Sequence, residues 1–164
     1  MNLKRNISVS ALKQTPIEKQ RVELVERKCI GHPDSLADGV AEAISRALCK
    51  EYSEECDGKI LHHNTDQGEV VAGESAPAFG GGKIIKPIYF LLTGRATRFF
   101  DGKTFATDAI AVKAARDYLH ETIPTFNMDT DVVVDCRMGA GSTDLQDVFN
   151  TRKGHTVIPR ANDT

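Results

Sequence analysis

The stretch from Glu26 to Asp38 holds the residues with the clearest chemical potential in this sequence. It reads Glu-Arg-Lys-Cys-Ile-Gly-His-Pro-Asp-Ser-Leu-Ala-Asp. If Pro33 is the first residue of a helix, His32 is its N-cap and Asp34 lies in its first turn. A helix start offers free N–H groups and a partial positive charge of roughly half an elementary charge. Together with an imidazole and a carboxylate, this corner is suited to phosphate accompanied by magnesium.

The same residues also fit an ordinary structural explanation. A Gly-His-Pro-Asp tetrapeptide can be a turn followed by a capped helix, without any ligand. Asp38 lies one helical turn after Asp34, so it could be a second acid of the site or a solvated carboxylate. Residue types and spacing leave both explanations open.

Two helices are predicted from apolar residues that recur with helical spacing. The first covers residues 33–52 and the second covers residues 104–122, with Thr107 as its cap and Asp108 near its positive end. The predicted buried stripes are Leu36, Val40, Ile44, Ala47, Leu48 and Tyr52 in the first helix, and Ala106, Ile110, Ala114 and Tyr118 in the second.

Strands are predicted at residues 20–29, 59–64, 68–75, 84–97 and 131–137. The first would deliver Glu26 close to the corner at Gly31. The second and third read as a hairpin around residues 65–67, and Gly80, Gly81 and Gly82 mark a bend before the fourth. The fifth contains three consecutive valines and is typical of a central strand.

This order of elements predicts an α+β fold, a two-layer α/β sandwich in which two helices cover one face of one sheet. We expect an N-terminal arm at residues 1–19, a two-layer domain at residues 20–137, and a connecting segment at residues 138–164.

Composition limits the classes of function. The net charge of -2 offers no long-range attraction to nucleic acid or to an anionic membrane. No run of apolar residues approaches the length of a membrane span. The four cysteines (Cys29, Cys49, Cys56 and Cys136) form no C-x-x-C pair, which fits a reducing cytoplasm.

The Gly-His-Pro-Asp string, followed by a hydroxyl residue and Leu-Ala-Asp, resembles the N-terminal signature of S-adenosylmethionine synthetases, also called methionine adenosyltransferases. The stretch at 68–74, Gly-Glu-Val-Val-Ala-Gly-Glu, is similar to the second signature of that family. The sequences at 137–146 and 159–164 resemble those of the archaeal-type branch of the family.

The resemblance implies a reaction and a set of site residues. The family forms S-adenosylmethionine from ATP and L-methionine, with release of phosphate and diphosphate. By analogy His32 is catalytic and contacts ATP, Asp34 binds Mg2+, and Glu74 contacts methionine. Glu26 and Asp163 match acidic residues near the nucleotide.

The resemblance also bears on architecture and assembly. The family is built from three intertwined copies of a β-α-β-β-α-β unit, and its active sites lie between two subunits, which implies a homodimer. Members are well over twice as long as this chain, so we expect an N-terminal portion that is inactive alone. The bacterial-type branch has a cation-binding glutamate near the place of His62 and His63, so a requirement for K+ is left open here.

Several further features allow two interpretations. The turn at 139–142, Gly-Ala-Gly-Ser, with a possible capping box at 143–146, could cover a nucleotide or could be an ordinary capped turn. His62 and His63 would point to opposite faces of a strand, which favours a structural or surface role. The basic residues Lys83, Lys86, Arg95 and Arg98 could meet a phosphate or could line a solvated strand edge.

A non-catalytic nucleotide- or partner-binding module with the same fold is the alternative to an enzyme.

Overall fold

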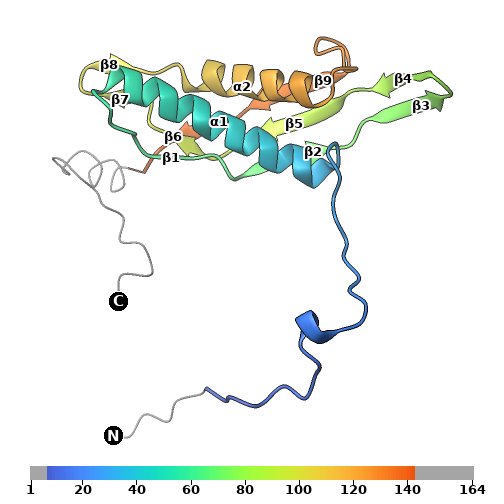
Figure 1. The fold of residues 1–164 in the computed structure, drawn as a ribbon. Helices are drawn as coiled ribbons and strands as arrows, with labels where there is room; N and C mark the ends of the chain where they lie inside the picture. Colours follow the sequence, from blue (N-terminus) through green and yellow to red (C-terminus); the bar gives the residue numbers. More distant parts are fainter. Residues whose placement is uncertain (1–6, 143–164) are drawn as a thin grey trace, which may run out of the picture.

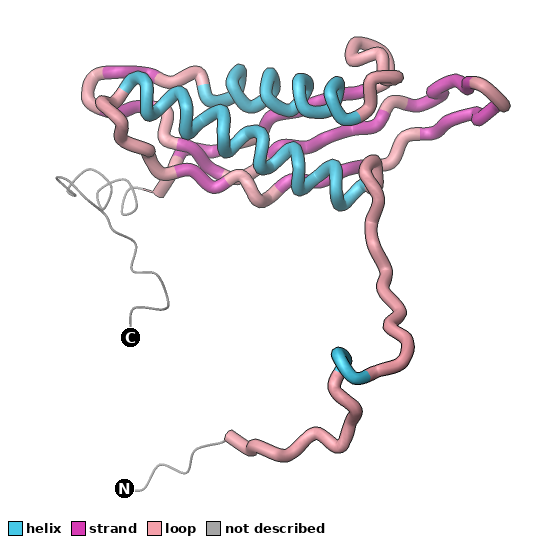
Figure 2. Tube along the Cα trace, in the orientation of Figure 1, coloured by secondary structure: helices cyan, strands magenta, loops and turns pink. Residues whose placement is uncertain are grey.

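A computed structural model describes residues 7–142 of the chain, as a body of strands with two helices on one face (Figure 1). An extended arm precedes the body, and a long hairpin projects from it (Figure 2). The predicted α+β class, with both helices on the same side of the strands, is confirmed. Within residues 7–142, no helix is both long enough and apolar enough to cross a membrane.

Helix α1 (Pro33–Glu55) follows the predicted pattern closely. Its fully buried side chains recur every fourth residue: Leu36, Val40, Ile44, Leu48 and Tyr52. At the far end of this stripe the Tyr52 hydroxyl donates a hydrogen bond to the carbonyl of Thr97 at 2.8 Å. Burial raises the pKa of Tyr52, so the hydroxyl remains a neutral donor.

Helix α2 (Thr107–Thr122) begins three residues later than predicted, and its buried stripe is displaced by one residue. The fully buried residues are Thr107, Ala111, Ala115 and Leu119. The prediction that Thr107 caps the helix is wrong. The N-cap is Ala106, without a side-chain cap, because the Thr107 side chain faces the core.

The strands under the helices form two three-stranded sheets with the same lateral order. One contains β2 (Gly68–Val71), β5 (Ile88–Leu92) and β9 (Val132–Cys136), with β5 in the middle. The other contains β1 (His63–Asn64), β6 (Arg95–Ala96) and β10 (Gly139–Ala140), with β6 in the middle. Each strand of one sheet leads along the chain into its counterpart in the other after a break of two or three residues.

This arrangement overturns two predictions about pairing. The expected hairpin between residues 59–64 and 68–75 is wrong, because β1 pairs with β6 and β2 pairs with β5. The two strands follow one another along the central strand instead of lying side by side. The strand at 131–137 exists, but it lies at the edge of its sheet, and Val133 is 41% exposed.

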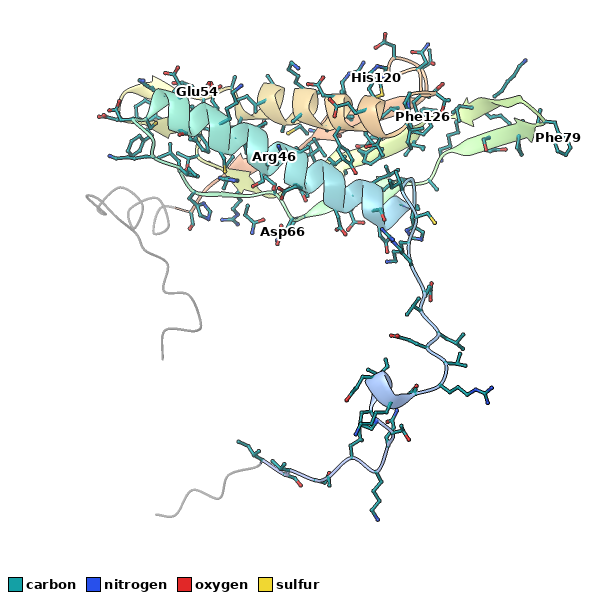
Figure 3. All side chains as sticks on the ribbon, viewed as in Figure 1. Arg46, Glu54, Asp66, Phe79, His120 and Phe126 are labelled. Carbon is teal, nitrogen blue, oxygen red and sulfur yellow. The ribbon has the colours of Figure 1, made fainter. Side chains whose placement is uncertain are left out.

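The predicted strand at 84–97 is divided into three. Its first part is β4 (Gly81–Lys86), which pairs with β3 (Glu74–Ala78) in the projecting hairpin. Pro87 separates β4 from β5 and cannot donate to a ladder. Phe79 lies at the exposed tip of the hairpin (Figure 3). A short hairpin of β7 (Phe99–Phe100) and β8 (Lys103–Thr104) precedes α2.

The predicted strand at 20–29 is wrong, because these residues are extended without pairing to any strand in the part described. Within residues 7–32 the arm carries one short 3-10 helix, Ile17–Lys19, and its side chains are exposed. Leu24, for example, is 94% exposed. Alternation of polar and apolar residues describes a strand only when a neighbouring strand supplies its hydrogen bonds.

Replacement of Gly39 tests the contact between the helices. A Cβ at Gly39 in α1 would overlap the ring and hydroxyl of Tyr118 in α2. Overpacking of this kind costs about 1–3 kcal/mol, against a gain of up to about 1 kcal/mol in helix propensity. We therefore expect Gly39→Ala to lower the free energy of unfolding in urea. In a Tyr118→Ala background the same change should be neutral or stabilising, and a loss of equal size there would contradict this account.

Candidate functional site

The start of α1 forms the corner that the sequence indicates. Gly31 has a φ of +95°, which favours glycine, and the N–H of His32 donates to the carbonyl of Cys29 at 3.0 Å. The N–H of Asp34 donates to Nδ1 of His32 at 3.2 Å, so His32 caps the helix as predicted. Because Nδ1 accepts this bond, the hydrogen of the neutral ring is on Nε2. The cap therefore selects the tautomer that can donate outward.

Asp34 is held by a basic side chain from the arm. The ammonium of Lys28 donates to Oδ2 of Asp34, and Nδ1 of His32 lies 3.9 Å from Oδ1. This hydrogen bond from Lys28 and the charge of its ammonium lower the pKa of Asp34. All three side chains are about half exposed, between 44% and 56%. The carboxylate is thus ionised and accessible.

A hollow of about 340 Å³ opens beside this corner. It is lined by Lys28, Pro33, Asp34, Ala37, Asp38, Gly68, Glu69 and Val70, and so joins the start of α1 to β2. Three of these residues are acids: Asp34, Asp38 and Glu69. Glu69 is the second residue of the Gly-Glu-Val-Val-Ala-Gly-Glu stretch, and the sequence pattern did not single it out as a site residue.

The acidic residues of this hollow suit a cation that is shared with a bound substrate better than one that is enclosed by protein ligands alone. Nowhere in residues 7–142 do three His, Cys, Asp or Glu side chains come together closely enough to hold a metal ion. Magnesium is commonly bound by one or two carboxylates, with water and substrate phosphates completing its shell. The residues present fit a magnesium ion of that kind.

A second hollow of about 550 Å³ adjoins the first, since Ala37, Asp38 and Gly68 line both. Its wall between α1 and β1 contains Ser45 and His63. Nδ1 of His63 donates to the carbonyl of Leu61 at 3.0 Å, so its Nε2 accepts from the Ser45 hydroxyl at 3.0 Å. These bonds support the structural role expected for His63.

The other predicted site residues lie apart from this corner. Glu26 is exposed in the extended arm, and Glu74 is exposed at the first position of β3, in register with Lys86. Neither lines the two hollows at α1. Asp163 lies outside the described residues. The structure therefore joins His32 with Asp34, while the roles of Glu26, Glu74 and Asp163 stay predictions.

The four basic residues singled out in the sequence have different surroundings. Lys83 and Lys86 lie on the projecting hairpin, and Arg95 is exposed on β6. Arg98 donates instead to both carboxylate oxygens of Asp108, at 2.8 and 3.0 Å. Arg98 is thus an engaged residue, not part of a solvated strand edge.

Comparison with known proteins gives a consistent result. The family model described as S-adenosylmethionine synthetase (AdoMet synthetase) matches residues 5–164. The chain is 63% identical over 162 residues to the S-adenosylmethionine synthase of Methanoregula boonei, which covers 99% of this chain and 40% of the relative. The corresponding protein of Methanospirillum hungatei is 60% identical, with the same coverage. That of Pyrococcus furiosus is 54% identical over 160 residues, covering 98% of this chain and 39% of the relative.

These relatives are S-adenosylmethionine synthases of archaea, so the predicted resemblance to the archaeal-type branch is confirmed. The chain spans about 40% of the length of the curated relatives it matches. Because the family model covers nearly all of the sequence, the chain belongs to the S-adenosylmethionine synthetase family.

Proposed function

We propose that this chain forms part of the active site of a methionine adenosyltransferase, which makes S-adenosylmethionine from ATP and L-methionine. The observation that carries the proposal is the family match over residues 5–164, in which His32 caps α1 beside an ionised Asp34. The chain covers about 40% of its relatives, so the complete site needs further groups. We propose that these come from the rest of the protein and from a second subunit, and that residues 1–164 alone are inactive.

In the proposed reaction the methionine sulfur attacks the 5′ carbon of ATP in line with the bond to triphosphate. A carbon–sulfur bond forms, the carbon–oxygen bond breaks, and the electron pair leaves on the triphosphate, which is then hydrolysed to phosphate and diphosphate. A thioether sulfur carries no proton, so no general base is required. The site must align the reactants and stabilise the negative charge on the departing oxygen.

His32 is the proposed donor to that oxygen. Its Nδ1 is engaged by the N–H of Asp34, which leaves Nε2–H as the donor. One well-placed donor of this kind is worth roughly 3–4 kcal/mol of barrier lowering. The free N–H groups of the first turn of α1 would add to the stabilisation of a phosphate.

Asp34 is the proposed ligand for magnesium, with Asp38 and Glu69 facing the same hollow. Without a cation these carboxylates would repel a polyphosphate. Magnesium, when bound, would supply positive charge to the phosphate oxygens. The ammonium of Lys28 now binds Oδ2 of Asp34, so it would compete with a metal for that carboxylate.

The remaining roles rest on the resemblance. Glu74 would pair with the ammonium group of methionine, and Glu26 and Asp163 would lie near the nucleotide. Lys86 stands opposite Glu74 in the hairpin and would compete for its carboxylate.

A potassium requirement stays open. The described cysteines are free thiols, which supports our expectation of a reducing cytoplasm.

The direct test of the proposal is product formation. The complete protein, incubated with ATP, L-methionine and magnesium, should yield S-adenosylmethionine detectable by mass spectrometry. The 164-residue chain should yield none. A complete protein that binds ATP but forms no product would favour the non-catalytic module instead.

Two substitutions of His32 separate its capping role from its chemical role. His32→Ala removes both, so we expect turnover of the complete protein to fall about 10²–10³-fold and stability to fall by about 1 kcal/mol. His32→Asn retains a good N-cap, so turnover should fall similarly while the melting temperature is kept. Normal turnover in the asparagine variant would contradict the proposed donor role.

Replacement of Lys28 tests the competition for Asp34. The unfolded chain lacks this contact, so its stabilising effect is present above the ordinary aspartate pKa and is lost as pH falls through the lowered pKa. Lys28→Met should raise the pKa of Asp34 toward its ordinary value, seen by NMR titration of the carboxyl carbon. Magnesium should then perturb that signal at a lower magnesium concentration than in the unsubstituted chain.

Lys113→Met is the matched control, because Lys113 holds Asp117 on α2 in the same way. It should leave the titration of Asp34 unchanged. A pKa of Asp34 that is the same in the Lys28→Met variant as in the unsubstituted chain would show that this lysine does not control the carboxylate.

Substitution of Glu74 tests the methionine site. Glu74→Gln removes the charge with little change of shape, so the KM for methionine should rise about tenfold while the KM for ATP stays near its original value. Steady-state kinetics of the complete protein give both values. Equal changes in both would argue against a specific contact with methionine.

A further inference from the structure

Two nucleophilic side chains of α1 meet one histidine of β1. The Sγ of Cys49 lies 3.6 Å from Nε2 of His63, and the Oγ of Ser45, one helical turn earlier, lies 3.0 Å from the same nitrogen. All three residues are partly exposed. Ser45 and His63 also line the hollow of about 550 Å³ beside α1. A thiol, a hydroxyl and an imidazole thus come together at the wall of this hollow.

The ring of His63 is held so that Nε2 is its acceptor. Nδ1 donates to the carbonyl of Leu61 at 3.0 Å, which places the hydrogen of the neutral ring on Nδ1. The ring also lies beside that of Tyr52, with 5.9 Å between the ring centroids. On β1, His63 is in register with the buried Ala96 of β6. A base whose tautomer and position are fixed by a third group, within reach of a thiol, is the arrangement that activates cysteine nucleophiles.

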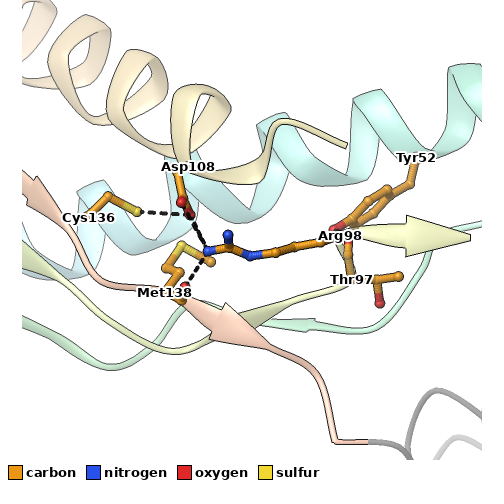
Figure 4. A network of polar contacts seen from close by, with 6 residues as sticks. All are labelled: Tyr52, Thr97, Arg98, Asp108, Cys136 and Met138. Carbon is orange, nitrogen blue, oxygen red and sulfur yellow. Dashed lines mark hydrogen bonds and ion pairs between the residues drawn. The ribbon is translucent and has the colours of Figure 1, made fainter. Parts of the chain in front are cut away.

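The other three cysteines have no such base in the described part of the chain. The thiol of Cys136 donates to the carboxylate of Asp108 at 3.6 Å (Figure 4), and burial raises the pKa of this thiol. Cys56 is 8% exposed, and burial likewise raises the pKa of its thiol. Cys29 is exposed in the arm, and its thiol makes no hydrogen bond within residues 7–142. Among the four, the thiol of Cys49 is the one that lies beside an imidazole.

We propose that Cys49 is a site of reversible modification by thiol–disulfide exchange, with His63 as the base and a small disulfide as the reactant. The reactant is small because the thiol is only partly exposed. The inference is independent of the proposed function, since neither residue belongs to the corner at His32 and Asp34.

In the exchange step the thiol proton of Cys49 passes to Nε2 of His63, and the thiolate attacks one sulfur of the disulfide. A sulfur–sulfur bond to Cys49 forms while the bond within the reactant breaks. The electron pair leaves on the second sulfur, which takes the proton from His63 and departs as a free thiol. Cys49 is thereby oxidised and the reactant reduced. An excess of thiol reverses the step, as is typical of the transient disulfides of reducing compartments.

Two opposing trends set the size of the effect. A free thiol is only a few per cent thiolate at pH 7, so proton transfer to His63 can raise the reactive fraction by roughly tenfold or more. A thiol that ionises more easily is also a weaker nucleophile, which offsets part of this gain. We expect a net acceleration of about threefold over the same cysteine in the unfolded protein.

Competitive alkylation of the complete protein tests the pairing. Iodoacetamide of two isotopic masses labels the native and the unfolded protein, and mass spectrometry gives a rate for each cysteine in both states. Cys49 should react about threefold faster in the native protein, whereas Cys56 and Cys136 should react more slowly there. Native protein incubated with hydroxyethyl disulfide should carry a mixed disulfide at Cys49, and dithiothreitol should remove it.

Three substitutions separate the chemical role of His63 from its packing. His63→Gln removes the base, so the native rate at Cys49 should fall about threefold. His62→Gln, at the neighbouring position, is the matched control and should leave that rate unchanged. Ser45→Ala removes the competing donor to Nε2, so the rate should stay the same or rise. A purely structural role of these bonds predicts a fall in both Ser45→Ala and His63→Gln.

Two results would overturn the inference. One is a native rate at Cys49 that is no faster than the rate in the unfolded protein. The other is a fall of equal size in His63→Gln and Ser45→Ala, which would show that the bonds to His63 act only through packing. Formation of S-adenosylmethionine by the unsubstituted protein is measured separately, so failure of the proposed function would leave this comparison intact.

Discussion

Burial of one stripe of α1 against the strands fixes the position of the proposed site at His32 and Asp34. Five large side chains of the helix are nearly inaccessible to solvent, and each contributes about 1.5–3 kcal/mol when buried. The N-cap at His32 is worth only about 1 kcal/mol. Packing therefore holds the helix, and the cap is free to serve another purpose, which is to orient the imidazole and select its tautomer.

The electrostatics at that corner depend on a balance of local charges. The helix start attracts anions, but Asp34, Asp38 and Glu69 face the same hollow and oppose them. In the structure Lys28 neutralises one of these carboxylates. A net charge of -2 gives no general attraction to polyphosphate, so the proposed function relies on local contacts at this corner and on a cation.

The strands connect this corner to the far end of the body. Three strand paths run side by side, and all three break at the same level, between β2, β5 and β9 on one side and β1, β6 and β10 on the other. At this level Gly94 allows a close approach to Asn64, and just beyond it Arg98 takes up the carbonyl of Met138. Backbone hydrogen bonds from the N–H of Thr93 to Gln67 and from the N–H of Arg137 to Leu92 still connect the three paths at the break.

Local features of the chain were predictable from the sequence alone. Helical spacing and the Pro33 start identified α1 and its cap, because caps and periodicity involve residues within a few positions of each other. The extent of α2 was nearly correct, but its stripe was displaced by one residue, since the spacing does not state which side meets the neighbouring helix. Recognition of the family rested on short signatures at these same local turns.

Pairing and proximity were decided only by the tertiary structure. Residues 20–29 alternate like a strand yet find no partner among the described residues, and β1 and β2 pair with the central strand instead of each other. Glu69 joins Asp34 and Arg98 joins Met138 across long sequence separations. Sequence determined the local conformations, because these depend on neighbouring residues. Strand partners and side-chain contacts depend on free energies shared by distant segments, which only the folded chain brings together.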